Sequence, residues 1–507
     1  MNKLKNIVKK IAPLHTPLGR KLKTYAASIG LANDIFFDGD YQKWITNSEP
    51  YLFLSPLTDK LEEVPLFSIV VPFYNTKEKY LAPLFESIVN QSYQNWEMII
   101  GDGSSIKELS KNIKYYADQD PRIKYFKFTK DTDISGNTNQ AIEMARGEYL
   151  VFCDHDDTLS KAALNEAAVV IRNKPDIDIV YSDEDKLTDN GKLRHSPYFK
   201  PGWSPHLFTY TNYTNHLSVV RRSLVEKVGG LRKAYNGSQD YDMLLRIHSS
   251  SEKQLKVYHI PKILYHWREA EGSTAIGHGE KTYASNAGKK ALKEYFTAIG
   301  LKQTSIDCGS DGPGYYRVSI EPKTIHKIGV VVRVSDNHNE NNSFIEHLKS
   351  KTITTLDVVY ANIINKNELD AVVEINHTAL PKDTNWLNEL VGVLELPYTG
   401  KVSPRIIDSS ESTVVDMGYC IGRNGILIQV HKNQGLSDLS IAGSSKRVKN
   451  VDKLSGAIVA YRLKKPTNKT YDVVWSPVDF VEYNIYGQSS CFNPNLRINN
   501  EDRITLL

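Results

Sequence analysis

The sequence predicts an α/β protein made of two successive domains, each built on a mostly parallel sheet. The chain has 507 residues, which is too long for one ordinary domain. In its first half, short apolar β-branched runs alternate with amphipathic helical patterns, as expected for parallel strands joined by helices. A similar alternation starts again near residue 328. The composition, 40% hydrophobic and 24% charged, is typical of a globular protein.

The elements of the first domain follow from these runs in order. Strands are predicted at 67–72, 96–100, 123–128 and 149–153, and helices at 79–90, 137–145 and 281–299. In the second half, strands are predicted at 328–332, 356–360 and 371–375, with a helix at 386–394. We therefore expect an N-terminal extension over 1–64, a first domain over 65–305, a linker over 306–325 and a second domain over 326–507.

The N-terminal extension is basic. Its first acidic residue is Asp34, and its first 23 residues include Lys3, Lys5, Lys9, Lys10, Arg20, Lys21 and Lys23. Leu4, Ile7, Val8 and Ile11 fall at helical spacing, which predicts a short amphipathic helix. Such a helix can rest on an anionic membrane surface, or it can be a solvated helix packed on the main domain.

Charge and cysteine content exclude several classes. Basic residues exceed acidic ones by only four, which argues against a nucleic-acid binder. Four distant cysteines without a C-x-x-C pair predict neither a disulfide scaffold nor a zinc site. No run approaches the roughly 20 apolar residues of a membrane span, and no secretory signal is recognisable. We expect a cytoplasmic protein, in contact at most with the inner face of the membrane.

An acidic cluster, Asp154-His155-Asp156-Asp157, follows the strand at 149–153 directly. Carboxylates this close repel one another, and a hard divalent cation, Mg²⁺ or Mn²⁺, would supply the missing counter-charge. Such an ion could stabilise a leaving diphosphate as a Lewis acid. The alternative is a solvated acidic turn that caps the helix starting near Ser160.

Other polar residues sit at neighbouring strand and helix ends. Asp102, between two glycines, could accept a hydrogen bond from a nucleotide base, or it could belong to a plain turn. Asp240 lies at a predicted helix start and is a candidate general base for an acceptor hydroxyl, with a simple N-cap as the alternative. His266 could ligate a metal and Arg268 could grip phosphate oxygens. Trp203 or Trp267 could offer a face for sugar stacking, although a histidine beside a tryptophan is usually structural.

Motifs in a fixed order make the first domain resemble a known family. They are Val71-Pro-Phe-Tyr-Asn75, Gln91-Ser-Tyr93, Gly101-Asp-Gly-Ser104, Ser135-Gly-Asn-Thr-Asn139, Ala145-Arg-Gly-Glu-Tyr149, Asp154-His-Asp-Asp157, Tyr181-Ser-Asp-Glu-Asp185, Phe199-Lys-Pro201, Gly237-Ser-Gln-Asp-Tyr-Asp242 and His266-Trp-Arg268. In this order they resemble the family-two inverting glycosyltransferases with the GT-A fold, especially bacterial enzymes that build cell-surface polysaccharides. The match covers about 210 residues.

The resemblance implies a role for each matching position. Those lining the nucleotide base and ribose of a UDP- or dTDP-sugar would be Pro72, Tyr74, Asp102 and Asn139. The metal and diphosphate motif would be Asp154, Asp156 and Asp157, closed by His266 and Arg268. Asp240 matches the catalytic base. The sugar and acceptor side would hold Asp183, Glu184, Asp185, Gln239, Trp203 and Trp267. One departure is Gly101, where many members carry an additional aspartate.

The second domain faintly repeats the first, over 328–487, but without its acidic motif. Where that motif should stand the sequence has Ile375-Asn376-His377, and we interpret Asp479 and Glu482 as remnants or surface charges. Without clustered carboxylates a divalent ion has no ligands. We expect a degenerate GT-A-like domain that serves acceptor binding, dimerisation or docking of partner glycosyltransferases, with an unrelated fold as the alternative.

Three functions compete. The first is an active glycosyltransferase that acts on a glycan, a lipid-linked acceptor or a teichoic-acid-like polymer. The second is a carbohydrate-binding pseudo-glycosyltransferase that acts as a scaffold. The third is a nucleotidyltransferase, which would normally show a Gly-rich phosphate loop after the first strand, and Phe73-Tyr-Asn-Thr76 is not one.

Overall fold

The computed structural model describes residues 39–52, 65–130, 132–251, 255–270, 278–308, 314–411, 413–421, 427–429, 449–464 and 470–482. The chain divides into two compact units: 1–203 with 212–292, and 204–211 with 293–507. Of the predicted N-terminal extension, only α4 (Gly39–Asn47) and α5 (Glu49–Leu52) are described. The predicted basic helix near the N-terminus lies outside the described residues.

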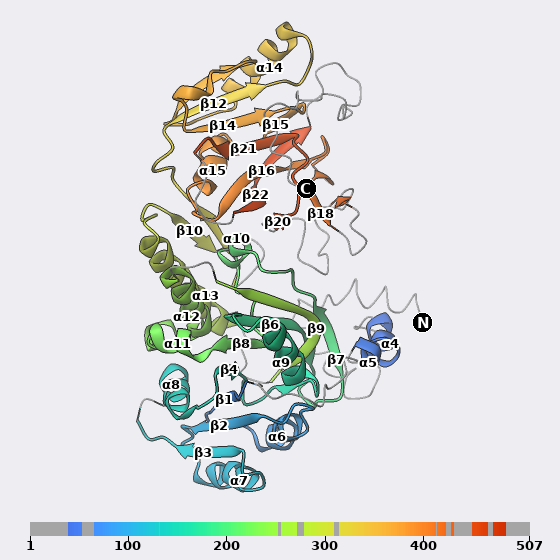
Figure 1. Ribbon diagram of the computed structural model, residues 1–507, viewed down its shortest axis with the longest axis vertical. Coiled ribbons are helices and arrows are strands. Elements are labelled where there is room, and N and C mark those ends of the chain that lie inside the picture. The colour runs from blue at the N-terminus through green and yellow to red at the C-terminus, as the bar shows by residue number, and fades with distance from the viewer. Residues whose placement is uncertain are drawn as a thin grey trace. The chain divides into compact units, whose positions relative to one another are not determined.

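The first unit is built on a nine-stranded mixed sheet (Figure 1). Its strands are β1 (Phe67–Phe73), β2 (Trp96–Asp102), β3 (Ile123–Lys127), β4 (Tyr149–Phe152), β5 (Thr158–Leu159), β6 (Ile179–Leu187), β7 (Arg194–Tyr198), β8 (Ser218–Arg221) and β9 (Val257–Arg268). They lie in the order β3-β2-β1-β4-β8-β6-β9-β5, with β7 paired to β6. The first four strands are parallel, and β8 is antiparallel to both of its neighbours. The α/β class and the four predicted strands of this unit are confirmed.

Helices connect these strands and cover the sheet. They are η1 (Glu78–Tyr80), α6 (Leu81–Val89), α7 (Lys107–Ala117), α8 (Ile134–Met144), α9 (Ala163–Asn173), α11 (Arg222–Lys227), η2 (Lys233–Tyr235), α12 (Gln239–Ser250) and α13 (His278–Ala298). Figure 1 shows α6 and α8 on opposite sides of β1 and β2. Helix α8 begins three residues before its predicted start because Asp133 caps it, accepting a hydrogen bond from the Gly136 amide.

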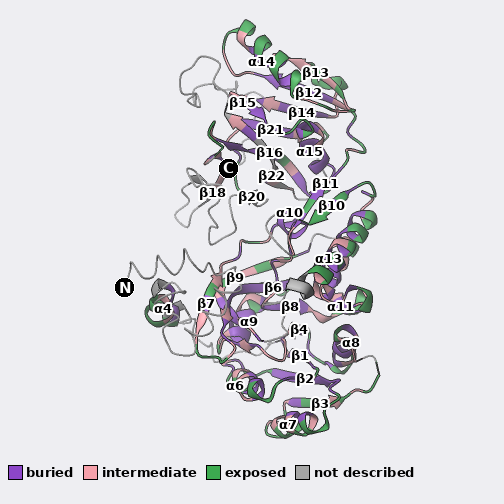
Figure 2. Cartoon of the chain, turned by 180° about the vertical axis from the view of Figure 1, so that it is seen from behind, coloured by how far each residue is buried: buried purple, intermediate pink, exposed green. Residues whose placement is uncertain are grey.

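The hydrophobic core of the first unit lies between the parallel strands and these helices. Strands β1 and β2 are buried along almost their whole length, as the purple ribbon of Figure 2 shows. Helix α6 contributes the buried stripe Leu81, Leu84, Phe85 and Ile88. Burial on both faces explains why these strands read as continuous apolar runs rather than as alternating patterns. No helix in the described part of the chain combines the length and apolarity of a membrane span.

The second unit contains a second mixed sheet. Its elements are β10 (Ser305–Cys308), β11 (Tyr316–Ser319), β12 (Lys327–Val332), α14 (His338–Ser350), β13 (Asp357–Ala361), η3 (Lys366–Glu368), β14 (Ala371–Ile375), β15 (Ala379–Pro381), α15 (Trp386–Val393), β16 (Thr399–Ile407), β17 (Val414–Asp416), β18 (Tyr419–Ile421), β19 (Leu427–Gln429), β20 (Lys449–Val451), β21 (Ile458–Arg462) and β22 (Tyr471–Glu482). The predicted strands and helix of this half are present within one or two residues.

The second sheet repeats the first over eight strands, and only β3 of the first sheet and β20 of the second, paired to β22, differ. Its order is β13-β12-β14-β21-β16-β22-β15, with β17 on β16, against β2-β1-β4-β8-β6-β9-β5 with β7 on β6. Every pair runs in the same sense: β21 is antiparallel to β14 and β16, and β22 is parallel to β16. Helices α14 and α15 occupy the chain positions of α6 and α9. The described residues contain no counterpart of β3. A second, smaller α/β domain of the same topology is therefore confirmed.

This repeat locates the counterparts of the acidic motif and of the proposed base. The loop after β4, which carries Asp154–Asp157, corresponds to residues 376–378 after β14, which contain no carboxylate. The segment from β8 to β9, which holds α12, corresponds to residues 463–470, again without a carboxylate in the sequence. Asp479 and Glu482 lie within β22, the counterpart of β9, and not in the segment that corresponds to the base.

The division between the units differs from the predicted linker at 306–325. That stretch includes most of the antiparallel pair β10–β11, and the division falls earlier, within α13. Residues 204–211, with the short helix α10 (Pro205–Phe208), belong to the second unit. The reason is local pairing: the Tyr316 amide donates to Tyr210 O at 2.8 Å, and His206 Nε2 lies 2.8 Å from Thr399 Oγ1.

Candidate active site

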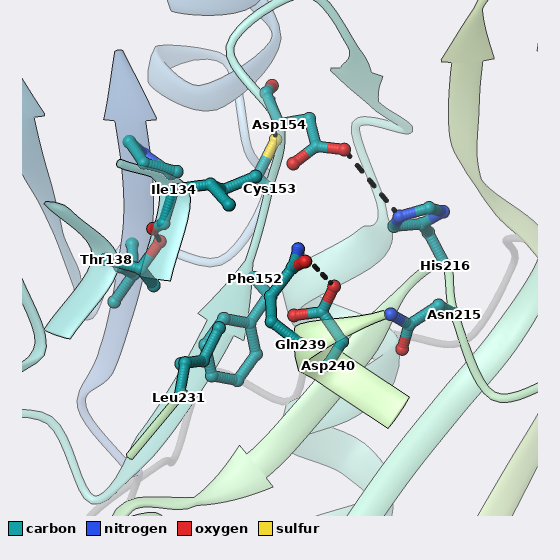
Figure 3. A pocket seen from close by; sticks show the side chains of 12 residues that line it. Ile134, Thr138, Phe152, Cys153, Asp154, Asn215, His216, Leu231, Gln239 and Asp240 are labelled. Carbon is teal, nitrogen blue, oxygen red and sulfur yellow. Dashed lines mark hydrogen bonds and ion pairs between the residues drawn. The ribbon is translucent and has the colours of Figure 1, made fainter. Parts of the chain in front are cut away.

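A pocket of about 360 Å³, counting space open to solvent, lies at the carboxyl ends of β1 and β4 in the first unit. Ligands bind at this end of the strands in α/β sheets. Its lining residues are Val70, Pro72, Ile134, Thr138, Phe152, Cys153, Asp154, Asn215, His216, Leu231, Gln239 and Asp240. Figure 3 shows Asp154 and Asp240 at two ends of the pocket, with Asn215 and His216 along one side and Ile134 and Leu231 along the other.

Asp240 occupies the first turn of α12, where the positive end of the helix dipole favours a carboxylate. Gln239 Nε2 donates to Asp240 Oδ2 at 3.1 Å, the interaction dashed in Figure 3. Burial nevertheless raises the pKa of Asp240 to about 6, and the negative charge of Asp154 adds to the rise. A carboxyl group with this pKa can accept a proton near neutral pH, which is what a general base must do.

His216 is the cation that balances this end of the pocket. Its Nε2 lies 3.8 Å from Asp154 Oδ2 and its Nδ1 lies 3.5 Å from Glu184 Oε2. Burial lowers the pKa of His216, but the interaction with the Glu184 carboxylate outweighs burial and raises it to about 9. The ring stacks on Tyr265 with centroids 4.7 Å apart. The imidazole is thus charged, fixed and directed at the pocket.

The rest of the acidic motif is buried beside the pocket. Asp157 is fully buried and accepts hydrogen bonds from Tyr265 Oη and the Arg268 amide, both at 2.6 Å. Burial raises the pKa of Asp157, and the nearby Asp156 and Asp154 raise it further. The pKa of Asp156 is also raised, by burial and by Asp154. Arg268 Nε donates to Asp156 O at 2.6 Å, so the end of β9 is bound to the motif.

These carboxylates are the side chains that a divalent cation would bind in this pocket. Among the described residues no three histidine, cysteine or acidic side chains converge as a complete ligand set. His266, predicted as a ligand, has its Nδ1 2.6 Å from Asp185 Oδ1. An ion held here would therefore take carboxylate oxygens from the motif and complete its shell with phosphate oxygens and water, as Mg²⁺ usually does.

The three carboxylates predicted on the sugar side lie behind the pocket and are paired internally. Asp183 Oδ1 accepts from the Lys200 amide at 2.8 Å and lies 2.7 Å from His259 Nε2. Glu184 binds the His216 amide and lies 3.3 Å from Lys200 Nζ.

Asp185, the third of them, accepts hydrogen bonds from Tyr41 Oη and Arg194 Nε, both at 2.6 Å. Its other oxygen, Oδ1, lies 2.6 Å from His266 Nδ1. None of the three carboxylates lines the pocket. Their direct contact with a substrate stays a prediction, and their contacts give Glu184 and Asp185 the role of fixing His216 and His266.

The predicted nucleotide-side residues are distributed unevenly. Pro72 lines the pocket, whereas Tyr74 is 55% exposed and outside its lining. Asp102 is fully buried and accepts from the Ser104 amide at 2.8 Å and Tyr125 Oη at 2.7 Å. Burial raises its pKa, but hydrogen bonds from Ser110 and Ser104 outweigh burial and lower it. Asn139 binds the amide and carbonyl of Leu231, both at 2.8 Å, and so holds one wall of the pocket.

Gly101, the position that departs from the family pattern, has a steric explanation. A Cβ atom there would come within 2.8 Å of Asn137 Oδ1 and 3.0 Å of Asn137 O. Asn137 in turn donates from Nδ2 to Phe73 O at 3.0 Å and to Gly101 O at 2.9 Å, which ties β1, β2 and α8 together. The glycine is therefore required by a buried asparagine that joins the two strands.

The predicted stacking residues do not line the pocket. Trp203 stacks on Tyr213 with centroids 6.3 Å apart, and Trp267 lies 5.9 Å from the His216 ring. Sequence reasoning missed Asn215 and His216, which the pocket contains. Their only signal is a polar pair, Asn215-His216, directly before the apolar strand β8.

Comparison with known proteins agrees with this geometry. The model of the family "Glycosyl transferase family 2" matches residues 68–229. An uncharacterised protein, y4gI, of Sinorhizobium fredii is 37% identical over 342 residues, which are 67% of this chain and 36% of that protein. The O-antigen biosynthesis protein RfbC of Myxococcus xanthus is 28% identical over 427 residues, 76% of this chain and 33% of that protein.

A third relative is shorter in its match. The putative teichuronic acid biosynthesis glycosyltransferase TuaG of Bacillus subtilis is 32% identical over 102 residues, 20% of this chain and 40% of that protein. The chain spans about a third of the length of the first two relatives. The residues that match the family model include β1 to β8 and the acidic motif of the pocket. Residues 68–229 therefore form a domain that matches glycosyltransferase family 2, and this domain lies in the first unit.

Proposed function

We propose that the first unit transfers a sugar from a nucleoside diphosphate to a hydroxyl group of a bacterial cell-surface glycan, with inversion at the anomeric carbon. One observation carries this proposal: Asp154 and Asp240, from two distant parts of the sequence, line the same pocket. The first belongs to the acidic motif that would face the diphosphate. The second belongs to a helix N-terminus and has the pKa of a base.

Asp240 would act on the acceptor. Its carboxylate takes the hydroxyl proton as the acceptor oxygen bonds to the anomeric carbon, and the bond from that carbon to the phosphate oxygen breaks. The nucleoside diphosphate leaves with the electron pair of that bond. Attack from the side opposite the leaving group inverts the anomeric centre, so the base and the diphosphate must lie at two ends of the sugar. Asp240 and Asp154 have this arrangement in the pocket (Figure 3).

A divalent cation fits the acidic motif. Burial and mutual repulsion raise the pKa of Asp156 and Asp157, which means that the motif is short of positive charge. We propose that Asp154 and Asp156 hold Mn²⁺ or Mg²⁺, which when bound would neutralise the charge that develops on the leaving diphosphate. Asp157 keeps the motif in place through Tyr265 and the Arg268 amide.

The acceptor is proposed by analogy. The names of the Myxococcus and Bacillus relatives refer to O-antigen and teichuronic acid, so a glycan or lipid-linked polymer is the acceptor class we propose. We also propose that the enzyme works at the cytoplasmic face of the membrane, which the basic residues of the first 23 positions would contact electrostatically.

The second unit is proposed to be non-catalytic. It shares the sheet topology of the first, but Asn376 and His377 stand where the acidic motif would be, and Asn376 Nδ2 is bound to Gly456 O at 2.9 Å. We propose that it binds acceptor glycan or a partner protein, and that it adds no second transfer activity.

Incubation with candidate nucleotide sugars and Mn²⁺, followed by mass spectrometry, tests the main proposal. Slow hydrolysis of one donor, abolished in Asp240→Asn, is the expected result. Binding without turnover would instead favour the pseudo-glycosyltransferase scaffold. Release of pyrophosphate from a nucleoside triphosphate and a sugar phosphate would favour a nucleotidyltransferase.

A further inference from the structure

The pocket contains a polar pair, Asn215 and His216, whose hydrogen-bonding groups the protein leaves unused. Asn215 Oδ1 is buried, lines the pocket and has no hydrogen-bond partner. A buried amide oxygen without a partner is costly, and native proteins rarely keep one without a reason. Figure 3 shows the nitrogen of this amide turned toward Asp240, so the side chain of Asn215 lies where it can hydrogen-bond a molecule bound in the pocket.

The imidazole of His216 has the same property. Its ring nitrogens lie 3.5 Å from Glu184 Oε2 and 3.8 Å from Asp154 Oδ2, distances too long for hydrogen bonds. Its backbone is nevertheless firmly fixed, because the amide donates to Glu184 and the carbonyl accepts from the buried Lys200. The ring is also stacked on Tyr265. A side chain held this precisely, with its Nε2 on the Asp154 side of the pocket, is placed to recognise a bound molecule.

The position of the pair indicates what it recognises. Figure 3 shows Asn215 beside Asp240 and His216 facing Asp154. In the proposed function the diphosphate lies toward Asp154 and the acceptor oxygen toward Asp240, so the sugar ring must pass in front of Asn215 and His216. The opposite wall consists mainly of Ile134 and Leu231, and its one hydroxyl group, that of Thr138, already donates to Ile134 O at 2.6 Å. Hydroxyl groups of the sugar can therefore find hydrogen-bond partners on the side of Asn215 and His216.

We infer that Asn215 and His216 bind hydroxyl groups of the transferred sugar and determine which sugar the enzyme accepts, an inference that rests on the proposed function. The amide can accept and donate, and the imidazole can donate, which suits hydroxyls of defined orientation. Sites built to bind a hydroxyl reject sugars that lack it or point it elsewhere, because their own polar groups are then left unpaired.

Calorimetry with metal-saturated protein separates this inference from its alternatives. UDP, dTDP, UDP-glucose, UDP-galactose, their N-acetylamino counterparts and dTDP-rhamnose are titrated in Mn²⁺ into the wild type, Asn215→Ala and His216→Gln. We expect each variant to bind the preferred nucleotide sugar at least about 10-fold more weakly. The affinity for the matching nucleoside diphosphate should change less than about twofold. The difference in affinity between epimeric nucleotide sugars should become smaller.

The matched control is Asn212→Ala, which removes an asparagine of the same segment that lies outside the pocket lining and accepts from Thr214 Oγ1 at 2.9 Å. It should alter neither affinity nor sugar preference. The thermal unfolding temperature gives a second readout. Asn215→Ala deletes an unpaired buried oxygen, so that temperature should stay equal or rise, whereas a structural asparagine would lower it.

Each contrary outcome has a distinct meaning. If the variants lost affinity for the nucleotide and for the nucleotide sugar equally, the pair would bind the diphosphate or support the fold. That result would overturn the inference. Unchanged sugar affinity in both variants would overturn it as well. A wild-type protein that binds none of these nucleotides with Mn²⁺ would refute the proposed function, and this inference with it.

Discussion

Replacing Asp240 by asparagine should make the protein more stable while it removes transfer activity. Burial and the charge of Asp154 raise the pKa of Asp240 from its ordinary value of 3.8 to about 6. Each tenfold change in an ionisation constant corresponds to about 1.4 kcal/mol. Keeping this carboxylate ionised in the folded protein at pH 7.5 therefore costs about 3 kcal/mol, and a neutral, nearly isosteric amide avoids that cost.

The pH dependence of this gain has a definite sign. Because the folded state raises the pKa, folded protein binds the proton more tightly than unfolded protein, and Asp240 costs stability only where it is ionised. The gain of Asp240→Asn should be complete above about pH 6, shrink between pH 6 and pH 3.8, and vanish below that. At pH 7.5, without metal, thermal unfolding should shift upward by roughly 5 °C or more.

Asp242→Asn is a matched control of opposite sign. Asp242 lies on the same helix and is buried, but it is paired with Arg246 at 2.9 Å and with Arg232. Replacing it by asparagine removes the carboxylate charge that pairs with two guanidinium groups and should cost about 2 kcal/mol. Differential scanning calorimetry at pH 7.5 and pH 4 measures both variants. If Asp240→Asn proved no more stable than the wild type at pH 7.5, Asp240 would not be the strained carboxylate described above.

Three further predictions concern the pocket and its support. Asp156→Ala should abolish the Mn²⁺ dependence of nucleotide-sugar binding, and calorimetric affinity that stays metal-dependent would contradict the proposed ligand. In wild-type protein, kcat/KM should fall about tenfold per pH unit below pH 6 as Asp240 is protonated, whereas a flat profile from pH 5 to 8 would exclude it as the base. Arg194→Ala should lower the free energy of unfolding by about 3 kcal/mol, because Asp185 and Glu49, each 2.6 Å from this guanidinium, lose this ionic partner. Denaturant titrations measure that change, and a loss below about 1 kcal/mol would contradict the importance of these ion pairs.

Four of the strands that the sequence predicts are rich in buried apolar residues. Strands β1, β2, β4 and β14 are buried on both faces, so their residues form recognisable apolar runs. Strand β6 was not predicted as an element because Ser182, Asp183, Glu184 and Asp185 occupy its centre. These side chains are buried only because Lys200, His259 and Arg194 pair with them from distant parts of the chain. No local pattern contains that information.

Prediction of the site from the sequence was limited in the same way. The position of Asp154 at a strand end indicated a ligand site, because the carboxyl ends of parallel strands meet at one edge, and the family resemblance assigned Asp240, at a helix start, to the same site. The place of Asn215 and His216 could not be foreseen, because it depends on the fixing of that segment by Glu184 and Lys200. Asp102 accepts hydrogen bonds from Tyr125 and from the Ser104 amide, and its contact with a nucleotide base stays a prediction.

A crystal structure of Asp240→Asn with Mn²⁺ and the donor found in the hydrolysis screen tests the central claim most directly. We expect an anomalous manganese peak beside Asp154 and Asp156, with the anomeric carbon of the sugar in the pocket between that peak and residue 240. Manganese or nucleotide bound elsewhere, or a sugar whose anomeric carbon faces away from residue 240, would contradict it.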